Sequence, residues 1–387
     1  MVLDLVFLLS GIFFLLILVY LFFLAFVSLW PEKQADPVLP QIRFGIIIPA
    51  HNEADLIGRT LERTLAVNYP RELYEVIVVA DNCDDDTEHI TRQAGVTCWP
   101  RLDPENRGKG NVLKWVFPRL LEYGDHGAYV VIDADTHMDE DFLQRINQHL
   151  CSGAHAVQGY SQVRHPEDSP MESLAFLGFA LNRNLRYRGR SKLGWTSNLM
   201  GTGMCFLRDV IEEYGWHTTS MVEDIEYEMM LHLHGIRVFF AHDAGVKVKL
   251  HKSVDQSKGQ RTRWDIGKFE VRNTYVPKLL KEGIRKRDVS YFDSAMELLL
   301  PPFSLLCVIV LACSGLFFLF GYHGVTLNLY IWLTVLSGFM LYVLVGLVTA
   351  KAEGRVYRSL LYAPLFMIWR FWIVCRESFK GNTGRKW

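Results

Sequence analysis

The sequence predicts an α/β domain with a largely parallel sheet, joined to helices that span a membrane. Three short apolar runs carry the first part of this prediction: Phe44–Pro49, Glu75–Ala80 and the stretch from Tyr129 to Asp133. Each run is rich in β-branched residues and is followed by a helical pattern, which is typical of buried parallel strands. Residues 3–29 carry the second part, because they form an apolar stretch long enough to cross a bilayer.

Composition narrows the functional classes. The chain has 387 residues, of which half are apolar, and its 41 Lys and Arg nearly balance its 42 Asp and Glu. A chain without an excess of basic residues offers no case for nucleic-acid binding. Its seven cysteines are scattered and contain no Cys-x-x-Cys pair, so we expect reduced thiols and neither a disulfide framework nor a zinc site.

The amino-terminal stretch is interpreted as an uncleaved membrane anchor over residues 1–30. It is longer than the apolar core of a signal peptide, has no basic leader, and shows no small-residue cleavage site before Trp30-Pro31. Residues 31–42 are polar and contain three prolines, which predicts a linker. The catalytic region is then expected over residues 43–275.

Acidic residues follow each of the three predicted strands. Glu53 follows the first, Asp81 the second, and Asp133 and Asp135 the third. Right-handed crossovers in a doubly wound fold bring the carboxyl ends of parallel strands to one rim, where such folds bind ligands. A turn at Arg107–Gly110 opens the helix before the third strand. We therefore expect a mononucleotide-binding domain with its site at this rim.

The second half of the catalytic region is less regular. Gln158–Val163 is expected to be an edge strand, and Pro170–Tyr187 a helix. Gly201-Thr202-Gly203 is expected to be a turn entering an apolar strand, and Glu223-Asp224 to precede a helix whose Glu226 and Glu228 are exposed charges. Gln260–Trp264 lies in a stretch of helical character running towards Tyr275.

The carboxy-terminal part is expected to return to the membrane. Residues 276–301 are interpreted as an interfacial, amphipathic segment, and residues 302–387 as a membrane region with a basic tail. Within it, 302–320 and 327–349 can each span, whereas 360–375 contains Arg370 and is expected to lie in the interface. The basic connection 351–358 and the basic tail place the catalytic region on the cytoplasmic face of a plasma or inner membrane.

Six motifs in order carry a family resemblance: Pro49–Glu53, Asp81, Arg107–Gly110, Asp133/Asp135, Glu223-Asp224 and Gln260–Trp264. Over about residues 43–275 the chain resembles the family 2 glycosyltransferases of the GT-A fold, a Rossmann-like α/β fold. It is most similar to their membrane-integrated members: cellulose, chitin and hyaluronan synthases, and ceramide glucosyltransferase. The Gln-x-x-Arg-Trp motif, 36 residues after Asp224, is the most specific feature.

The resemblance implies a nucleotide-sugar donor held at the strand ends. Asp133 and Asp135 would bind Mg²⁺ or Mn²⁺, with Asp135 the direct ligand, and the cation would assist departure of the diphosphate. Asp81 would contact the base or ribose, and Lys109 a phosphate. Glu53 would assist near the base or, alternatively, serve only as a helix N-terminal carboxylate. The alternative for Lys109 is a solvated surface lysine.

The resemblance also implies how the acceptor is activated. Asp224 would be the general base that takes the proton of the acceptor hydroxyl. Glu223 would orient the acceptor or the base, its alternative being a helix cap. Gly201 and Thr202 would let the backbone approach the acceptor, unless they form a plain turn.

The Gln-x-x-Arg-Trp motif completes the expected site. Arg263 would make bidentate contact with phosphate, and Gln260 would hydrogen-bond to it. Trp264 would stack on a sugar ring, or would otherwise be a core or membrane-interface aromatic.

The expected function is therefore inverting transfer, forming a β-glycoside, from a nucleotide-diphospho-sugar that the resemblance makes UDP-linked. A growing polysaccharide is the favoured acceptor, and a membrane lipid such as ceramide, diacylglycerol or polyprenyl phosphate is the alternative. Three spans are few for a polysaccharide conduit, so a polymer would call for an oligomer or a secretion partner. A catalytically dead scaffold is disfavoured, because Asp133, Asp135 and Asp224 are all present.

Overall fold

The computed structural model describes residues 2–31, 38–164, 169–248, 254–321 and 326–368, with the side chains of Met171 and of residues 254–265 left out of the description. The chain divides into two compact units. Among the described residues, the sheet unit comprises 38–164 and 194–298, and the helical unit comprises 2–31, 169–193 and 299–368.

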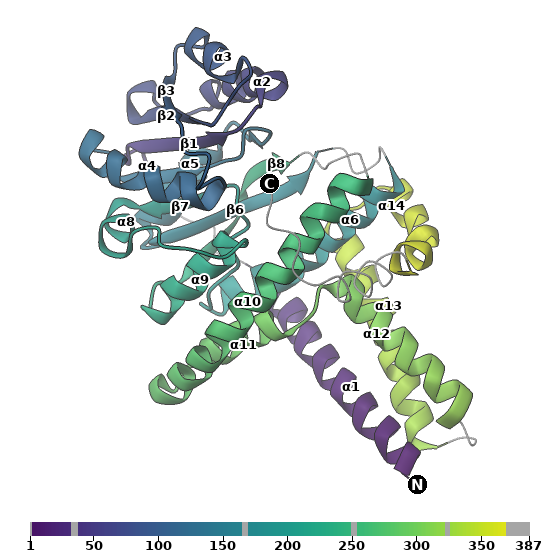
Figure 1. Cartoon of the computed structure of the whole chain (residues 1–387). Coiled ribbons are helices and arrows are strands. Elements are labelled where there is room, and N and C mark those ends of the chain that lie inside the picture. The colour runs from purple at the N-terminus through teal and green to yellow at the C-terminus, as the bar shows by residue number, and fades with distance from the viewer. Residues whose placement is uncertain (1, 32–37, 165–168, 249–253, 322–325, 369–387) are drawn as a thin grey trace. The chain divides into compact units, whose positions relative to one another are not determined.

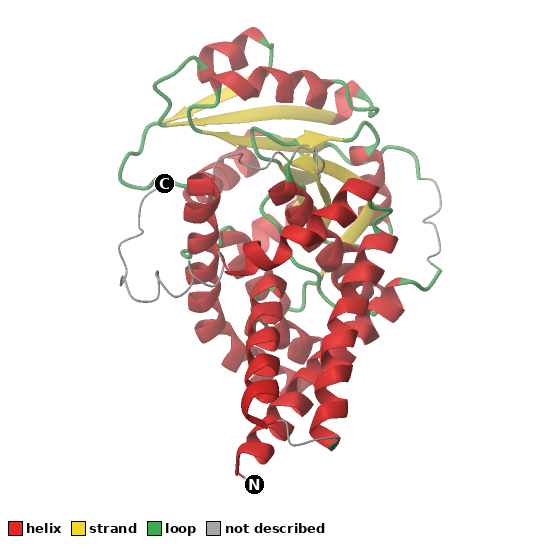
Figure 2. Ribbon diagram, turned by 90° about the vertical axis from the view of Figure 1, so that its right-hand side faces the viewer, coloured by secondary structure: helices red, strands yellow, loops and turns green. Residues whose placement is uncertain are grey.

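The sheet unit is built on one eight-stranded mixed sheet, drawn as yellow arrows in Figure 2. Four of its strands run parallel, and β1 lies between β2 and β4 in this group. Strand β7 is antiparallel to both β4 and β6. The strand order is β3 (Thr97–Arg101), β2 (Tyr74–Asp81), β1 (Phe44–Ala50), β4 (Ala128–Val131), β7 (Met204–Leu207), β6 (Ala156–Val163), β8 (Val238–Val248) and β5 (His137–Met138).

The three strands expected from the apolar runs are confirmed, but the sheet differs from the expectation elsewhere. Strand β3 was not expected, because its sequence Thr-Cys-Trp-Pro-Arg is short and contains a proline. The prediction of an edge strand over 158–163 is wrong, since β6 lies between β7 and β8. Two of its polar side chains, Gln158 and Ser161, are both buried.

Helices cover both faces of the sheet, as the alternation along β1 requires. Ile46 and Ile48 face one core, and Ile47 faces the other. Helices α2 (Ala54–Leu65) and α5 (Phe142–Cys151) close the first core. The second core is closed by α4 (Lys109–Tyr123), α8 (Arg208–Tyr214) and α9 (Glu223–Leu233). Short elements α3 (Thr87–Gln93) and η1 (Arg71–Leu73) complete this part of the fold.

A smaller core joins α9 to the two helices that follow β8. These are α10 (Val254–Lys286) and α11 (Val289–Leu299), and Met229 of α9 packs with Leu279 and Tyr291. The segment 276–301, expected to be interfacial, thus comprises the end of α10 and the whole of α11. One face of α11 is buried in the sheet unit, including Tyr291 and Leu298.

Residues 38–42, the described end of the expected linker, are held against α5 rather than left extended. The side chain of Asn147 accepts hydrogen bonds from the backbone N–H groups of Gln41 and Ile42, both at 3.2 Å. Its amide donates to the carbonyl of Leu39 at 3.1 Å. The chain therefore enters β1 along a fixed path.

The helical unit contains α1 (Val2–Ser28), α12 (Phe303–Leu316) with its π-turn η3 (Phe317–Gly321), and α13 (Leu327–Thr349). Figure 1 labels these helices. In the described part of the chain, three helices are long and apolar enough to cross a membrane: Val2–Ser28, Phe303–Gly321 and Leu327–Thr349. They coincide with the three stretches expected from the sequence.

Residues 169–193 belong to this unit and not to the sheet. They form α6 (Pro170–Ala180), the π-helix η2 (Leu181–Tyr187) and α7 (Arg188–Lys192). Leu177, Leu181 and Leu185 pack into the apolar core formed with α1 and α13. A Cβ at Gly189 would lie 2.3 Å from the carbonyl oxygen of Leu24, so only glycine permits this contact with α1. The expected catalytic region 43–275 is thus interrupted by helices that pack on apolar spans.

The chain described after α13 is helical up to residue 368, with α14 (Gly354–Ser359) followed by the short turn η4 (Leu360–Tyr362). The prediction that 360–375 lies in the membrane interface falls partly outside the described residues, as does the basic tail.

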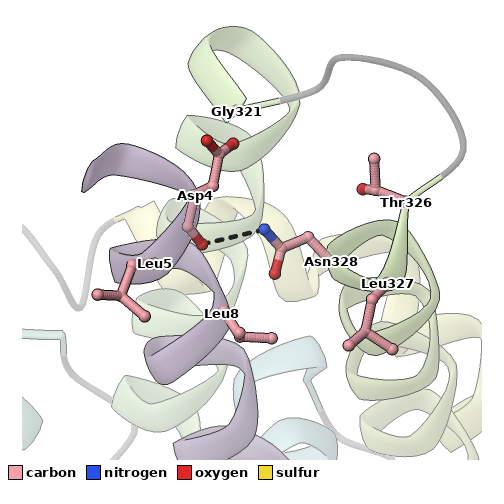
Figure 3. Close-up of a pocket in the computed structure, with 7 residues that line it drawn as sticks. All are labelled: Asp4, Leu5, Leu8, Gly321, Thr326, Leu327 and Asn328. Carbon is pink, nitrogen blue, oxygen red and sulfur yellow. Dashed lines mark hydrogen bonds between the residues drawn. The ribbon is translucent and has the colours of Figure 1, made fainter. Parts of the chain in front are cut away.

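A pocket in the helical unit lies between the amino end of α1, the last residue of η3 and the first residues of α13 (Figure 3). The side-chain amide of Asn328 donates to the backbone carbonyl of Asp4 at 3.0 Å and fixes these ends together. The lining residues are Asp4, Leu5, Leu8, Gly321, Thr326, Leu327 and Asn328. They include none of the site residues that the sequence predicts.

Candidate active site

The loops after β1 and β2 are locked together at the rim of the sheet. The side chain of Asn52 donates to Asp84 at 2.5 Å and accepts from the backbone N–H of Asp84 at 3.0 Å. The carboxylate of Asp85 accepts from the backbone N–H groups of Ala54 and Thr87, each at 3.0 Å. The acidic loop 84–86 is exposed, and it holds the starts of α2 and α3 in place.

Asp81 lies at the end of β2 and is only 2% exposed. Its carboxylate forms a buried ion pair with Arg101 and accepts from the amide of Asn82 at 2.9 Å. Arg101 also donates to Asp103 at 2.8 Å, so it ties β3 to the loop that leads to Lys109. Sequence reasoning missed Arg101 because its strand was missed. The role of Asp81 in holding a base or ribose stays a prediction.

Lys109 is the first residue of α4 and reaches across to two other loops. Its Nζ donates to the carboxylate of Asp133 and, at 2.7 Å, to the carbonyl of Gly201. Burial by itself would lower the pKa of Lys109, but Asp133, Glu223 and Asp224 raise it above its usual value. Lys109 is therefore a charged residue at the centre of the site and not a solvated surface lysine.

The turn 201–203 lies close to the expected metal ligand Asp133, to Lys109 and to the expected base Asp224. Thr202 Oγ1 accepts from the backbone N–H of Asp133 at 3.0 Å. Gly201 has φ +76°, and a Cβ there would lie 3.5 Å from Asp224 Oδ2 and 3.7 Å from Lys109 Nζ. The turn thus brings Asp133, Lys109 and Asp224 to one place, which is more than a plain connection would do.

Two buried residues that the sequence did not reveal hold this turn. Gln158 of β6 accepts from the N–H of Met200 and donates to the carbonyl of Thr202, both at 2.9 Å. Glu228 of α9 accepts from the N–H of Leu199 at 3.2 Å and is fully buried, so its expected exposure is wrong. A polar residue at helical spacing suggests an exposed face, and only the tertiary contact with the turn reveals otherwise.

Replacing Gln158 by methionine tests this support. The change keeps the side-chain length but removes the hydrogen bonds that Gln158 makes with the N–H of Met200 and the carbonyl of Thr202. A buried unsatisfied polar group costs about 1–3 kcal/mol. We expect a lower thermal midpoint in detergent and a slower transfer rate. Gln162→Met on the same strand is the matched control, and equal midpoints for the two variants would contradict the assignment.

Glu223 and Asp224 form the amino end of α9. Burial raises the pKa of both carboxyls, and for Glu223 the neighbouring charge of Asp224 raises it further. Asp224 accepts a hydrogen bond from the N–H of Ile225 at 2.8 Å. A Cβ on Gly110 would lie 3.2 Å from Cβ of Glu223, so this residue stands beside the turn that carries Lys109. A base with a raised pKa is well suited to accept a proton near neutral pH.

These raised pKa values predict a pH dependence for proton transfer. A carboxyl whose pKa is raised stays protonated, and inactive as a base, at pH values where a free aspartate (pKa about 3.9) is ionised. We expect the transfer rate, measured with saturating donor, to rise with pH through a range above that value. Glu223→Gln removes a neighbouring negative charge and should move this rise to lower pH. A profile that is flat from pH 5 to pH 8 would count against a carboxylate base.

Glu53 lies just before α2, at the helix N-cap position, yet its side chain makes no capping hydrogen bond. Burial, and then the charges of Asp135 and Asp133, raise the pKa of Glu53 to about 7. This shift shows that the carboxylates of Glu53, Asp133 and Asp135 lie within electrostatic range of one another. Glu53 thus stands at the amino end of α2, as the helix-terminal alternative expects, and its role near the base stays a prediction.

The donor set at the end of β4 fits a hard divalent cation. Asp133 and Asp135 are carboxylates one residue apart, and the Asp133 side chain is 41% exposed and open to a ligand. Among the described residues, no group of three or more His, Cys, Asp or Glu is already arranged around one metal position. A cation here would take two protein carboxylates and complete its shell with other oxygens, as Mg²⁺ does with phosphates.

The Gln-x-x-Arg-Trp residues lie within α10, but their side chains are outside the described part of the chain. The proposed contacts of Gln260, Arg263 and Trp264 therefore stay predictions.

The sequence is similar to known glycosyltransferases. Residues 40–267 match the family model described as "Glycosyltransferase like family 2". Poly-beta-1,6-N-acetyl-D-glucosamine synthase of Staphylococcus aureus is 24% identical over 262 residues, which cover 65% of this chain and 61% of that protein. Beta-monoglucosyldiacylglycerol synthase of Synechocystis is 24% identical over 252 residues, covering 62% and 52%.

A solved structure extends the likeness to the fold. The mannosyltransferase PcManGT from Pyrobaculum calidifontis, in complex with GDP-Man and Mn²⁺, is 17% identical with a TM-score of 0.60, covering 93% of this chain and 97% of that one. The chain spans about three fifths of the first relative and about half of the second. The fold is the GT-A fold that the motifs predicted. Since the family model covers more than half of the sequence, this chain belongs to glycosyltransferase family 2.

Proposed function

We propose that this protein transfers a sugar from a nucleotide-diphospho-sugar to an acceptor hydroxyl with inversion, and that Asp224 is the general base. The observation that carries the proposal is the convergence of Lys109, Asp133 and Asp224 on the turn at Gly201. A phosphate-binding cation, a metal-binding carboxylate and a half-buried carboxylate with a raised pKa are the groups this reaction needs.

The donor would lie along the rim formed by β1, β2 and β4. Asp81, held by Arg101, would contact the base or ribose, and Glu53 would assist close by. Lys109 would turn from Asp133 to the diphosphate, where its charge offsets the charge that develops as the sugar leaves. Asp133 and Asp135 would hold Mg²⁺ or Mn²⁺, which supplies Lewis-acid stabilisation of the leaving diphosphate.

The Gln-x-x-Arg-Trp residues would meet the donor from α10. We expect Arg263, supported by Gln260, to contact the diphosphate as a planar fork. Trp264 offers an aromatic face for a sugar ring.

The acceptor hydroxyl would be activated by Asp224. Its oxygen attacks the anomeric carbon from the face opposite the diphosphate, the bond to the diphosphate breaks, and the hydroxyl proton passes to Asp224. Inversion of an α-linked donor gives a β-glycoside. Glu223 would orient the acceptor, and Gly201 and Thr202 would let the backbone approach it closely. UDP is the nucleotide we propose.

A growing polysaccharide is the acceptor we propose first, since a polysaccharide synthase is among the relatives. A second candidate is a membrane lipid, favoured by the small number of spans: three among the described helices, which is few for a polysaccharide conduit within one chain. The relative from Synechocystis is named for a lipid product. If the product is a polymer, an oligomer or a secretion partner would supply the conduit.

The sheet unit is proposed to face the cytoplasm. The connection after α13 carries Lys351, Arg355 and Arg358, whereas residues 322–326 between the preceding spans contain neither Lys nor Arg. Basic connections stay on the cytoplasmic side. With spans at α1, α12 and α13, the sheet unit would lie on that same side.

The test is product analysis with purified full-length protein in detergent. The protein is incubated with Mn²⁺ or Mg²⁺, radiolabelled UDP- and GDP-sugars in turn, and native membrane lipids. A long water-soluble ladder supports a polysaccharide acceptor, and a single chloroform-extractable product supports a lipid acceptor. Absence of both transfer and donor hydrolysis with every donor would overturn the proposal.

A further inference from the structure

A second group of charged residues lies beside Asp135 and does not include Lys109. It consists of four cations and a histidine contributed by α2, β5, the end of β6, and β8. We call it the basic patch: Arg59, Arg63, His137, Arg164 and Lys247. The donor-binding residues proposed above do not include any of them.

The backbone brings the patch together beside Asp135. His137 of β5 pairs directly with Lys247 of β8, and neighbours across an antiparallel pair have adjacent side chains. The N–H of Arg164 donates to the carbonyl of Val248 at 3.0 Å, next to Lys247. The guanidinium of Arg164 donates to the backbone carbonyl of Asp135 at 2.7 Å. The patch therefore begins at the residue proposed to hold the metal.

Arg59 and Arg63 add an exposed pair of like charges one turn apart on α2. In the part of the chain that the structure describes, neither side chain has a hydrogen-bond or ion-pair partner. Like charges at this spacing destabilise an isolated helix by a few tenths of a kcal/mol. The two arginines therefore repel each other in the ligand-free protein. An anionic ligand bound between them would offset this repulsion.

The patch is positive overall. Among the described residues, Lys247 pairs with Asp139 at 2.8 Å, and the charge of Asp135 acts on Arg164. Helix α2 is held against the same loop, because the hydroxyl of Thr60 donates to the backbone carbonyl of Ala134 at 2.6 Å, and Thr60 directly follows Arg59. The four cations give the patch its charge.

We propose that the basic patch binds a phosphoryl group carried by the acceptor, which makes the acceptor a phosphorylated lipid. Arginine forks match phosphate geometry, and two arginines with unused donors lie beside a third that contacts the Asp135 backbone. A phosphoryl group held there is next to the donor site but is separate from Lys109, which stands at Asp133. The inference rests on the proposed transfer reaction and decides between its two acceptor classes.

The experiment measures binding in the absence of any nucleotide sugar. Full-length protein in detergent is titrated with dioctanoyl phosphatidic acid, with dioctanoylglycerol, and with inorganic phosphate, and binding is followed by calorimetry. The test variant is Arg59→Gln/Arg63→Gln. The matched control is Lys114→Gln/Arg119→Gln, which removes two exposed cations from α4 on the opposite face of the sheet.

We expect the Arg59→Gln/Arg63→Gln variant to bind dioctanoyl phosphatidic acid about tenfold more weakly than wild type, the loss expected for two partly exposed ion pairs. The control should stay within about twofold, and dioctanoylglycerol should bind weakly to all three proteins. Added salt should weaken the wild-type binding. Inorganic phosphate binding as tightly as the lipid would overturn the acceptor role, because the site would then be one for a free anion.

Equal affinities for wild type and the patch variant, or an equal loss in the control, would also overturn the inference. Hydrolysis of nucleotide sugar by the same preparations separates this failure from failure of the proposed function. If hydrolysis continues while the affinities are equal, only the phosphoryl site is lost. If no preparation hydrolyses any donor, the transfer reaction itself is wrong.

Discussion

Replacement of Asp224 by asparagine should reduce sugar transfer by about 10²- to 10⁴-fold, the usual contribution of a general base. The asparagine keeps the side chain's size and can still accept the hydrogen bond from the N–H of Ile225. It cannot take a proton from the acceptor hydroxyl. The measurement is the rate of a single turnover with saturating donor and acceptor, which reports the chemical step without product release.

Donor binding separates a lost base from a damaged site. Asp224 is one of several acids around Lys109, and Asp133 remains to hold that ammonium. The affinity of the Asp224→Asn variant for UDP with Mn²⁺ should therefore stay within a few-fold of wild type. Glu122→Gln, an exposed change at the end of α4, should alter neither quantity. A wild-type transfer rate in Asp224→Asn would remove this residue from the mechanism.

The positions of the rim residues were predictable from the chain alone because strand ends are local features. An apolar run that stops at Asp81 or Asp133 marks the carboxyl end of a strand, and parallel topology then brings such ends together. The glycine-rich turn before β7 and the start of α9 at Glu223 are local signals of the same kind. These elements appear where the sequence placed them.

The contacts that support the site were not predictable because they are between residues distant in sequence. Gln158 and Glu228 look like solvent-facing residues of a strand and a helix, yet both are buried against the turn 199–203. Arg101 ends a short strand that contains a proline, and its pairing with Asp81 depends on a sheet position that periodicity does not reveal. The grouping of 169–193 with the apolar helices depends likewise on tertiary packing.

Replacement of Asp135 by alanine should weaken Mn²⁺ binding and, with it, the binding of donor. Changes to residues that only support a metal ligand commonly cost about 10- to 100-fold in metal affinity, so loss of a direct ligand should cost at least about 100-fold. Asp135 is expected to matter more than Asp133, because we propose it as the direct ligand of the cation. The affinity for Mn²⁺ is measured by electron paramagnetic resonance, with and without UDP.

The control for this prediction is a variant of another acidic residue at the same rim of the sheet, Asp86. Asp86 is exposed at the start of α3, and its side chain makes no capping hydrogen bond, so Asp86→Asn changes the charge near the site without removing a ligand. If the negative field alone attracted the cation, Asp86→Asn and Asp135→Ala would weaken Mn²⁺ binding to a similar, small extent. Direct coordination instead requires a large loss in Asp135→Ala alone, together with UDP binding that no longer responds to added Mn²⁺. Unchanged Mn²⁺ affinity in Asp135→Ala would mean that the pair Asp133 and Asp135 does not hold the metal.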